Sequence, residues 1–102
     1  MSKKYFLLFL FTGLSFSIFA QNAQIKGKVI AENYPVEGAT VQVQKSNNGV
    51  VTDVNGNFTI KNLEAGTYTL EVNFIGFERY TQRVTLKANQ LLELTIELKS
   101  DL

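Results

Sequence analysis

The sequence contains no cysteine, histidine or tryptophan, and Pro35 is its single proline. Without cysteine no disulfide can stabilise the fold, so packing alone must hold a small domain together. The absence of cysteine and histidine also removes the commonest zinc ligands and the usual general base of enzymes. We therefore expect a protein that is not an enzyme and that needs no metal and no cofactor.

Charge is sparse and nearly balanced. The chain has 10 basic and 9 acidic residues, for a net charge of +1, and no block of basic residues stands out. A near-neutral chain without such a block is a poor ligand for nucleic acid or for an anionic membrane surface. We expect neither partner.

The first 20 residues have the pattern of a secretory signal peptide. A short basic start, residues 2–4, precedes an apolar run from Tyr5 to Phe19 that contains five of the eight phenylalanines. A small residue, Ala20, then comes before the polar Gln21, as expected at a cleavage site. The alternative, a transmembrane anchor, needs about 20 apolar residues, and this run is shorter. We predict a signal peptide over 1–20, cleavage between Ala20 and Gln21, and export to the periplasm or the outer membrane.

After a short linker, residues 21–24, apolar and polar residues alternate in short segments up to residue 98. Such alternation predicts half-buried β-strands, and turn residues recur every eight to twelve positions. The sequence predicts an all-β fold, a seven-stranded Greek-key β-sandwich over 25–98 with a tail at 99–102. The expected strands lie near residues 25–29, 40–44, 50–52, 58–60, 67–74, 77–86 and 92–98.

Turn residues separate these strands. Asp53 can accept a backbone hydrogen bond two residues along, and glycine tolerates the left-handed geometry that tight turns need. The expected turn glycines are Gly38, Gly56, Gly66 and Gly76. Tyr68 follows the turn at Gly66, so we expect a tyrosine corner, with its hydroxyl bonded to the backbone carbonyl of Glu64 or Ala65.

Two acidic patterns deserve comparison with known chemistry. Asp53 and Glu64 stand where a calcium loop has its first and twelfth positions, but an expected strand intervenes, so a turn is the better interpretation. Glu93 and Glu97 lie about 13 Å apart on one extended strand, whereas the catalytic carboxylates of glycosidases lie about 5–9.5 Å apart. We interpret both glutamates as part of a solvated strand face.

Few aromatic residues are expected in solvent. Tyr34, in the first loop, is the best candidate for stacking on a sugar or contacting a partner. Phe77 and Tyr80 could form a small patch at a sheet edge. For each of these residues, covering one end of the core is the plainer interpretation.

The ordered set of turn and strand motifs resembles the carboxypeptidase-regulatory-like domain, a transthyretin-like β-sandwich. The motifs that carry this resemblance are Gly27-Lys28-Val29, Pro35 with Gly38-Ala39-Thr40-Val41, Thr52-Asp53 with Gly56-Asn57-Phe58, Leu63 with Gly66 and Tyr68, and Ile75-Gly76-Phe77. Directly behind a signal peptide, this form resembles the N-terminal extension of SusC-type TonB-dependent receptors of Bacteroidetes-type bacteria, which import glycans and other nutrients.

The resemblance implies a role as an accessory and no catalytic residues. Such receptors continue into a plug domain and a β-barrel, whereas this sequence ends at Leu102, so we expect no transport by this chain alone. We predict an interaction module that recognises a protein partner, either a receptor or another component of the TonB system, by its surface or by strand addition. The alternative is a carbohydrate-binding module, since the fold is also grouped with carbohydrate-binding-like sandwiches.

Overall fold

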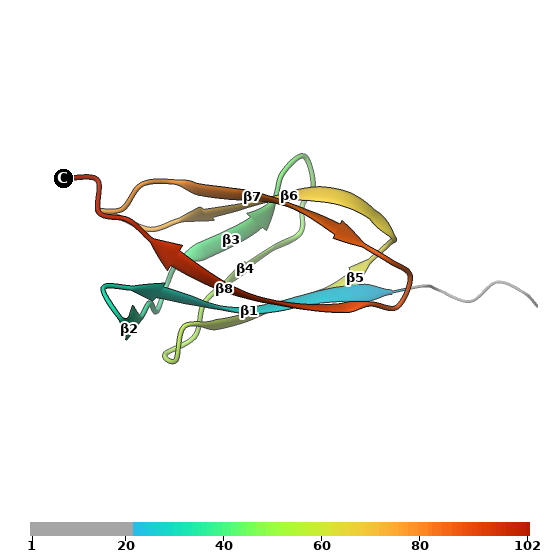
Figure 1. Cartoon of the computed structure of the whole chain (residues 1–102), viewed down its shortest axis with the longest axis horizontal. Helices are drawn as coiled ribbons and strands as arrows, with labels where there is room; N and C mark the ends of the chain where they lie inside the picture. Colours follow the sequence, from blue (N-terminus) through green and yellow to red (C-terminus); the bar gives the residue numbers. More distant parts are fainter. Residues whose placement is uncertain (1–21) are drawn as a thin grey trace, which may run out of the picture.

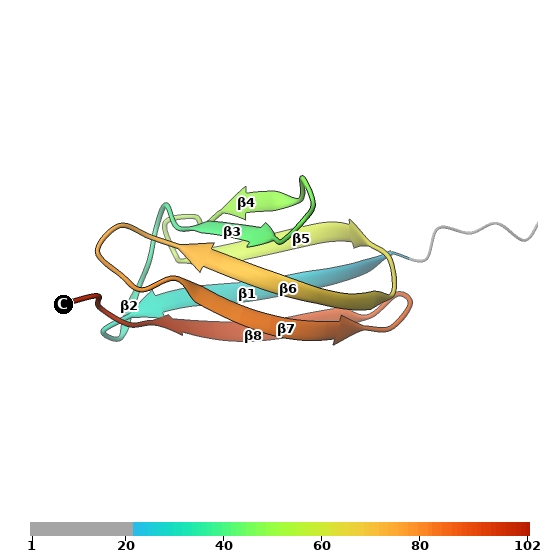
Figure 2. The ribbon, with the colours of Figure 1, turned by 90° about the horizontal axis from the view of Figure 1, so that it is seen from above.

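Two four-stranded β-sheets pack face to face in residues 22–102, the part of the chain that the computed structural model describes (Figures 1 and 2). The predicted signal peptide and its cleavage site, Ala20 and Gln21, lie outside these residues. No helix that could span a bilayer occurs within 22–102. The strands are β1 (Ala23–Ala31), β2 (Tyr34–Pro35), β3 (Thr40–Val43), β4 (Gly49–Val51), β5 (Asn57–Leu63), β6 (Gly66–Asn73), β7 (Tyr80–Leu86) and β8 (Leu91–Leu98).

The first sheet is built around β1. On one edge β1 pairs in parallel with β8 along its length, from Gln24 opposite Leu91 to Ala31 opposite Leu98. On its other edge it pairs antiparallel with β5 and then with the short strand β2. Both edges of β1 are therefore occupied, with β8 as the outer strand on one side and β5 and the two-residue β2 on the other.

The second sheet has the order β4-β3-β6-β7, with every pair antiparallel. β6 lies beside β3 and not beside β5, the strand before it in the chain, because the chain crosses from one sheet to the other between β5 and β6. Figure 2 shows β4 on one side of the sandwich and β7 on the other, the side where β8 also lies.

The structure differs from the sequence prediction in four places. It has eight strands instead of seven, because Tyr34 and Pro35 in the first loop pair with the end of β1 as β2. β1 begins at Ala23, inside the expected linker. β7 begins at Tyr80 and not at Phe77. The expected tail is also paired, since Ser100 forms an isolated antiparallel bridge with Phe77.

The core is apolar and lies between the sheets, as the alternation predicted. Buried side chains come from every strand except β2 and β4, and the most enclosed are Ile25, Val29, Val41, Val43, Leu70, Val72 and Ile96. No buried side-chain nitrogen or oxygen in the described part of the chain lacks a hydrogen-bond partner. Burial of polar side chains therefore lowers the stability of the fold little.

Gly27, at the centre of β1, makes room for the aromatic ring of Phe58. The two residues are opposite one another in the β1–β5 ladder. A Cβ at Gly27 would lie 2.6 Å from two ring carbons of Phe58 and 2.9 Å from the carbonyl oxygen of Leu94. The Phe58 ring thus occupies the space that a side chain at Gly27 would need.

We predict that Leu70→Ala lowers the free energy of unfolding by about 2–5 kcal/mol, because it leaves a cavity at a fully buried position. Urea denaturation followed by circular dichroism measures this change. Leu91→Ala is the control, since Leu91 is half exposed and its truncation should change stability little. Equal stability of the two variants would contradict the assignment of Leu70 to the core.

We also predict that Gly27→Ala destabilises the fold by about 1–3 kcal/mol, because the added methyl group overlaps the Phe58 ring and nearby backbone. Gly49→Ala is the matched control, since a Cβ there would meet its nearest atom at 3.5 Å, an ordinary contact. Adding Phe58→Leu to Gly27→Ala should make the penalty smaller than the sum of the two single changes. Simple additivity would show that the ring is not the obstacle.

Candidate interaction surface

The turn at Asp53 is held by its own side chain. Asp53 Oδ1 accepts hydrogen bonds from the backbone N–H groups of Asn55 and Asn57, both at 2.9 Å, and the Gly56 N–H closes the turn on the Asp53 carbonyl. Glu64 lies beyond the far end of β5, away from this turn. The Asp53 carboxylate therefore organises backbone, and the two acidic residues do not share a site.

Gly56 fastens this turn to the first sheet. Its φ is +78°, and a Cβ at this position would lie 2.6 Å from the Val29 carbonyl oxygen. The Gly56 carbonyl accepts a hydrogen bond from the Val29 N–H at 2.8 Å. Only glycine allows such a close approach with this backbone geometry. Gly38 and Gly76 also have positive φ in turns, and Gly66 begins β6.

The hydrogen bond predicted for Tyr68 is present. Its hydroxyl donates to the carbonyl oxygen of Glu64 at 2.5 Å, across the turn that leads into β6. This contact joins the end of the β5–β6 connection to the second sheet. It is the arrangement called a tyrosine corner, and its role here is structural.

The aromatic residues considered as contacts are placed unequally. Tyr34, on β2, has 74% of its surface exposed and is the one aromatic residue in the exposed class within 22–102. Phe77 and Tyr80 are half-buried and pack against the core. The Phe77 ring stacks on the Phe74 ring, with the two ring centroids 5.8 Å apart. The Tyr80 hydroxyl donates to Gln82 Oε1. The structure therefore does not bring the three together as an aromatic platform.

Thr52 links two loops through its side-chain hydroxyl, a role that the sequence did not predict. Its side chain is buried, and its hydroxyl donates to the Val36 carbonyl at 2.6 Å and accepts from the Ala39 N–H at 2.9 Å. It thereby holds the loop between β2 and β3 against the segment that directly follows β4. Its place beside Asp53 in a turn motif was the available signal, but its two partners are 13 and 16 residues away.

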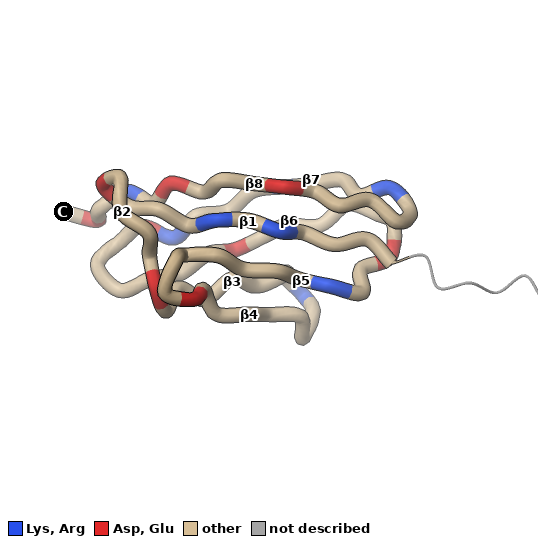
Figure 3. Tube along the Cα trace, turned by 90° about the horizontal axis from the view of Figure 1, so that it is seen from below, with Lys and Arg blue, Asp and Glu red and all other residues tan. Residues whose placement is uncertain are grey.

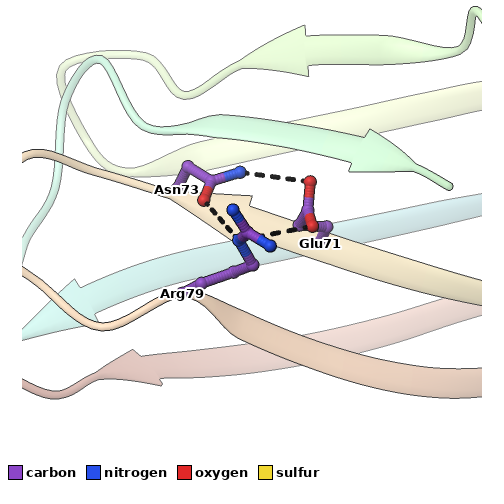
Figure 4. A network of polar contacts seen from close by, with 3 residues as sticks. All are labelled: Glu71, Asn73 and Arg79. Carbon is purple, nitrogen blue, oxygen red and sulfur yellow. Dashed lines mark hydrogen bonds and ion pairs between the residues drawn. The ribbon is translucent and has the colours of Figure 1, made fainter.

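A polar cluster holds the start of β7 to β6 (Figure 4). Arg79 Nε donates to Asn73 Oδ1 at 3.3 Å and lies 3.5 Å from Glu71 Oε1, while the Asn73 amide donates to Glu71 Oε2 at 3.3 Å. Arg79 is largely exposed, so this ion pair adds little stability. The contacts lie just before Tyr80, where β7 begins its pairing with β6.

β7 and β8 lie on the same side of the sandwich, and the backbone hydrogen bonds that link their flanking segments lie beyond the ends of both strands. At one end the Gln90 N–H donates to the Lys87 carbonyl at 3.1 Å and closes the connecting turn. At the other end the Glu78 N–H donates to the Lys99 carbonyl at 2.7 Å, and the Asp101 backbone N–H donates to the Gly76 carbonyl at 3.2 Å. Between these ends the two strands belong to different sheets, so each has a free edge.

Charge is shared unevenly between the two ends of the sandwich (Figure 3). The turns and tail at the end where β1 and β8 finish carry the carboxylates Glu32, Glu37, Asp53, Glu78 and Asp101, beside the basic Arg79 and Lys99. The turns at the opposite end carry Lys45, Lys61 and Lys87, beside the acidic Glu64. No group of three or more histidine, cysteine, aspartate or glutamate residues that could hold a metal ion occurs in 22–102. This distribution suits recognition of a charged partner surface.

We predict that Tyr68→Phe lowers the free energy of unfolding by about 0.5–1.5 kcal/mol, because it removes the hydroxyl that satisfies the Glu64 carbonyl. Thermal and urea denaturation both measure the loss. Tyr34→Phe serves as the control, because Tyr34 is exposed and its hydroxyl should not matter to the fold. If Tyr68→Phe is as stable as the parent, the hydrogen bond of the tyrosine corner does not stabilise the fold.

The sequence of the chain is similar to part of two TonB-dependent receptors. The chain is 28% identical over 94 residues to the TonB-dependent receptor P39 of Formosa agariphila, and 34% identical over 95 residues to the TonB-dependent receptor SusC of Bacteroides thetaiotaomicron. These alignments cover 91% and 90% of this chain but only 9% of each receptor. The chain thus spans about a tenth of the length of these relatives.

Solved structures share the fold at low sequence identity. A chain of a type II cohesin–X-dockerin complex from Acetivibrio cellulolyticus has a TM-score of 0.66 at 24% identity, covering 76% of this chain and 58% of that one. The minor pilin of Streptococcus agalactiae has a TM-score of 0.64 at 16% identity, covering 81% and 46%. Catechol 1,2-dioxygenase from Acinetobacter reaches 0.66 at 7% identity, covering 84% and 55%. At such identities these likenesses concern the β-sandwich alone.

A sequence model of the CarboxypepD_reg-like domain matches residues 25–102, which is most of the chain and nearly all of the described sandwich. The match begins in β1 and includes every later strand. It agrees with the resemblance found from the turn motifs. The chain therefore belongs to the carboxypeptidase-regulatory-like domain family.

Proposed function

We propose that this chain is an exported, non-catalytic interaction module of a TonB-dependent nutrient receptor system of the outer membrane. The observation that carries the proposal is the similarity to two TonB-dependent receptors over about 90% of the chain. The signal-peptide pattern of residues 1–20 supports export. The module works either as a domain joined to such a receptor or as a separate periplasmic adaptor.

The chemistry of the surface favours binding over catalysis. The chain has neither histidine nor cysteine. The one cluster of polar side chains in Figure 4 is engaged internally, since Arg79, Asn73 and Glu71 bond to one another. Nucleophilic and general-base catalysis both need a reactive group with a partner that activates it. The described residues instead present the free edges of β-strands and charged turns, which can bind a partner.

A carbohydrate-binding module remains the second candidate, and Tyr34 is the observation in its favour. Stacking on a sugar ring needs an exposed aromatic face, and Tyr34 provides one next to the acidic turns. Half-burial of Phe77 and Tyr80 leaves this residue without aromatic neighbours in the exposed class. The single ring favours a protein partner over a glycan.

Cell fractionation tests the proposed function. An antibody against residues 22–102 is used to blot the membrane, periplasmic and cytoplasmic fractions of the native cells after chemical crosslinking. We expect the signal in the outer-membrane or periplasmic fraction, in a crosslinked species that also contains a TonB-dependent receptor. A signal confined to the cytoplasm, or one that never includes a receptor, would contradict the proposal.

A glycan array separates the two candidates. We expect no specific glycan to bind the purified chain. Binding that is lost in Tyr34→Ala and retained in Tyr34→Phe would favour the carbohydrate module, since the phenylalanine keeps the stacking face.

A further inference from the structure

Three of the four edge strands carry features that discourage the addition of another strand. β4 has only three residues. β5 has a bulge, with an extra residue opposite the start of β1 and Asn62 at a φ of 63°, and Lys61 stands beside it. β7 presents the exposed Arg83 and turns a polar residue, Gln82, toward the interior. Short length, bulges, and charged or polar side chains are the usual protections of sheet edges.

β8 has fewer of these protections, although its outer face carries the exposed Glu93 and Glu97. It is eight residues long, and Leu91–Leu98 contains no proline, glycine, lysine or bulge. The Gln24 N–H of β1 donates to the Gln90 carbonyl, and the backbone groups of a strand point alternately to its two sides. The N–H and C=O groups that point away from β1 are therefore those of Leu91, Glu93, Thr95 and Glu97.

The chain itself already pairs with the continuation of this edge. The carbonyl of Lys99, the next residue in the same alternation, accepts from Glu78, and Ser100 bridges Phe77 in antiparallel fashion. The pairing stops where Arg79 turns onto β6 (Figure 4). A hollow of about 310 Å³, lined in part by Arg79, Thr81 and Glu97, marks this departure. The edge from Glu97 back to Leu91 is left open.

We propose that the free edge of β8 binds an extended, basic segment of a partner protein by strand addition. The partner strand continues, along Leu91–Leu98, the pairing that residues 76–78 make with 99–101. Strand addition supplies affinity through backbone hydrogen bonds and specificity through alternate side chains. This inference rests on the proposed function and names the surface and the class of partner segment.

The side chains of β8 define the pattern of that segment. On the inner face Leu92 and Leu94 are only half-buried, so apolar side chains of an added strand would cover them. On the outer face Glu93 and Glu97 are exposed, and the one ion pair found in residues 22–102 joins Arg79 to Glu71. Glu93 lies opposite Lys26 in the β1–β8 ladder and Glu97 lines a hollow with Arg79 and Lys99, but neither carboxylate forms an ion pair within the described sandwich. Lysine or arginine at two positions four residues apart in an added strand would face both carboxylates from the open side of β8.

The same carboxylates oppose pairing with a second copy of this chain. An antiparallel pair of β8 strands centred on Thr95 would place Glu93 opposite Glu97 of the other copy, twice. Like charges directly opposite one another destabilise a strand pair, whereas opposite charges stabilise it. Charge complementarity thus favours a basic partner strand over self-association.

A designed peptide tests the proposal. The probe has nine residues, with valine at the even positions, lysine at positions 3 and 7, and threonine at the rest. Its binding to the purified chain is measured by fluorescence anisotropy, and residue-resolved amide exchange locates it. We expect binding to slow exchange at Leu91, Glu93, Thr95 and Glu97, while the other β8 amides, already bonded to β1, change little. A peptide with glutamate at positions 3 and 7 should bind more weakly.

Two pairs of variants give matched controls. Thr95→Pro removes an N–H from the free edge without touching the β1–β8 ladder, and should abolish the protection. Thr85→Pro makes the same change at a free-edge position of β7 and should leave binding intact. If either proline variant unfolds, Glu93→Lys with Glu97→Lys decides, since both positions are exposed. We expect this double change to weaken the lysine peptide about tenfold and to strengthen the glutamate peptide.

The outcomes separate this inference from the proposed function. Absent binding, protection on β7 instead of β8, or equal binding by the charge-reversed chain would overturn the edge assignment. If crosslinking to a receptor is observed in the same series, the proposed function stands while the edge assignment fails. If the peptide protects β8 but the native chain is confined to the cytoplasm, the strand-binding edge stands and the receptor role fails.

Discussion

The parallel pairing of β1 with β8 is the contact on which the rest of the structure depends. It joins the first and last strands of the sandwich along their whole length, from Gln24–Leu91 to Ala31–Leu98. Because β1 gives its other edge to β5 and β2, the first sheet closes around a single central strand. In a chain without disulfides this pairing ties the two ends of the domain together, and it leaves β8 with one edge exposed.

A second constraint decides how far that edge is covered. Residues 76–78 pair with 99–101 and would extend along β8 if the chain continued in the same direction. Arg79 instead bonds to Asn73 and Glu71 on β6, and β7 joins the second sheet. The exposed ion pair contributes little energy, but it lies at the residue where the chain chooses between two sheets. The seven-residue ladder between β6 and β7 then holds the chain in the second sheet, and the edge of β8 stays open.

This geometry suits an accessory domain better than an enzyme. The polar side chains with defined partners, such as Asp53, Thr52 and Tyr68, bond to backbone and stabilise turns. The remaining surface offers an edge strand, one end richer in carboxylates and an opposite end richer in lysines. The chain belongs to the carboxypeptidase-regulatory-like domain family and is similar to part of two TonB-dependent receptors, and these findings support the proposal of an interaction module.

Local patterns in the sequence determined the strands, their inward faces and the turns, because strand alternation and turn chemistry depend on neighbouring residues. The alternation around Leu70 and the Asp53 and Tyr68 contacts could all be predicted in this way, since their partners lie within four residues or on the same strand face. The tertiary structure alone decided the parallel β1–β8 pairing, the short strand at Tyr34, the half-burial of Phe77 and the bonds of Thr52. The β1–β8 pairing and the Thr52 bonds join residues far apart in the sequence, and their energies depend on which strands become neighbours. The strand at Tyr34 pairs locally with Ala31, but its two exposed residues carry no alternation that would predict it. The free edge of β8 belongs to this second group, because an edge exists only once the sheets are assembled.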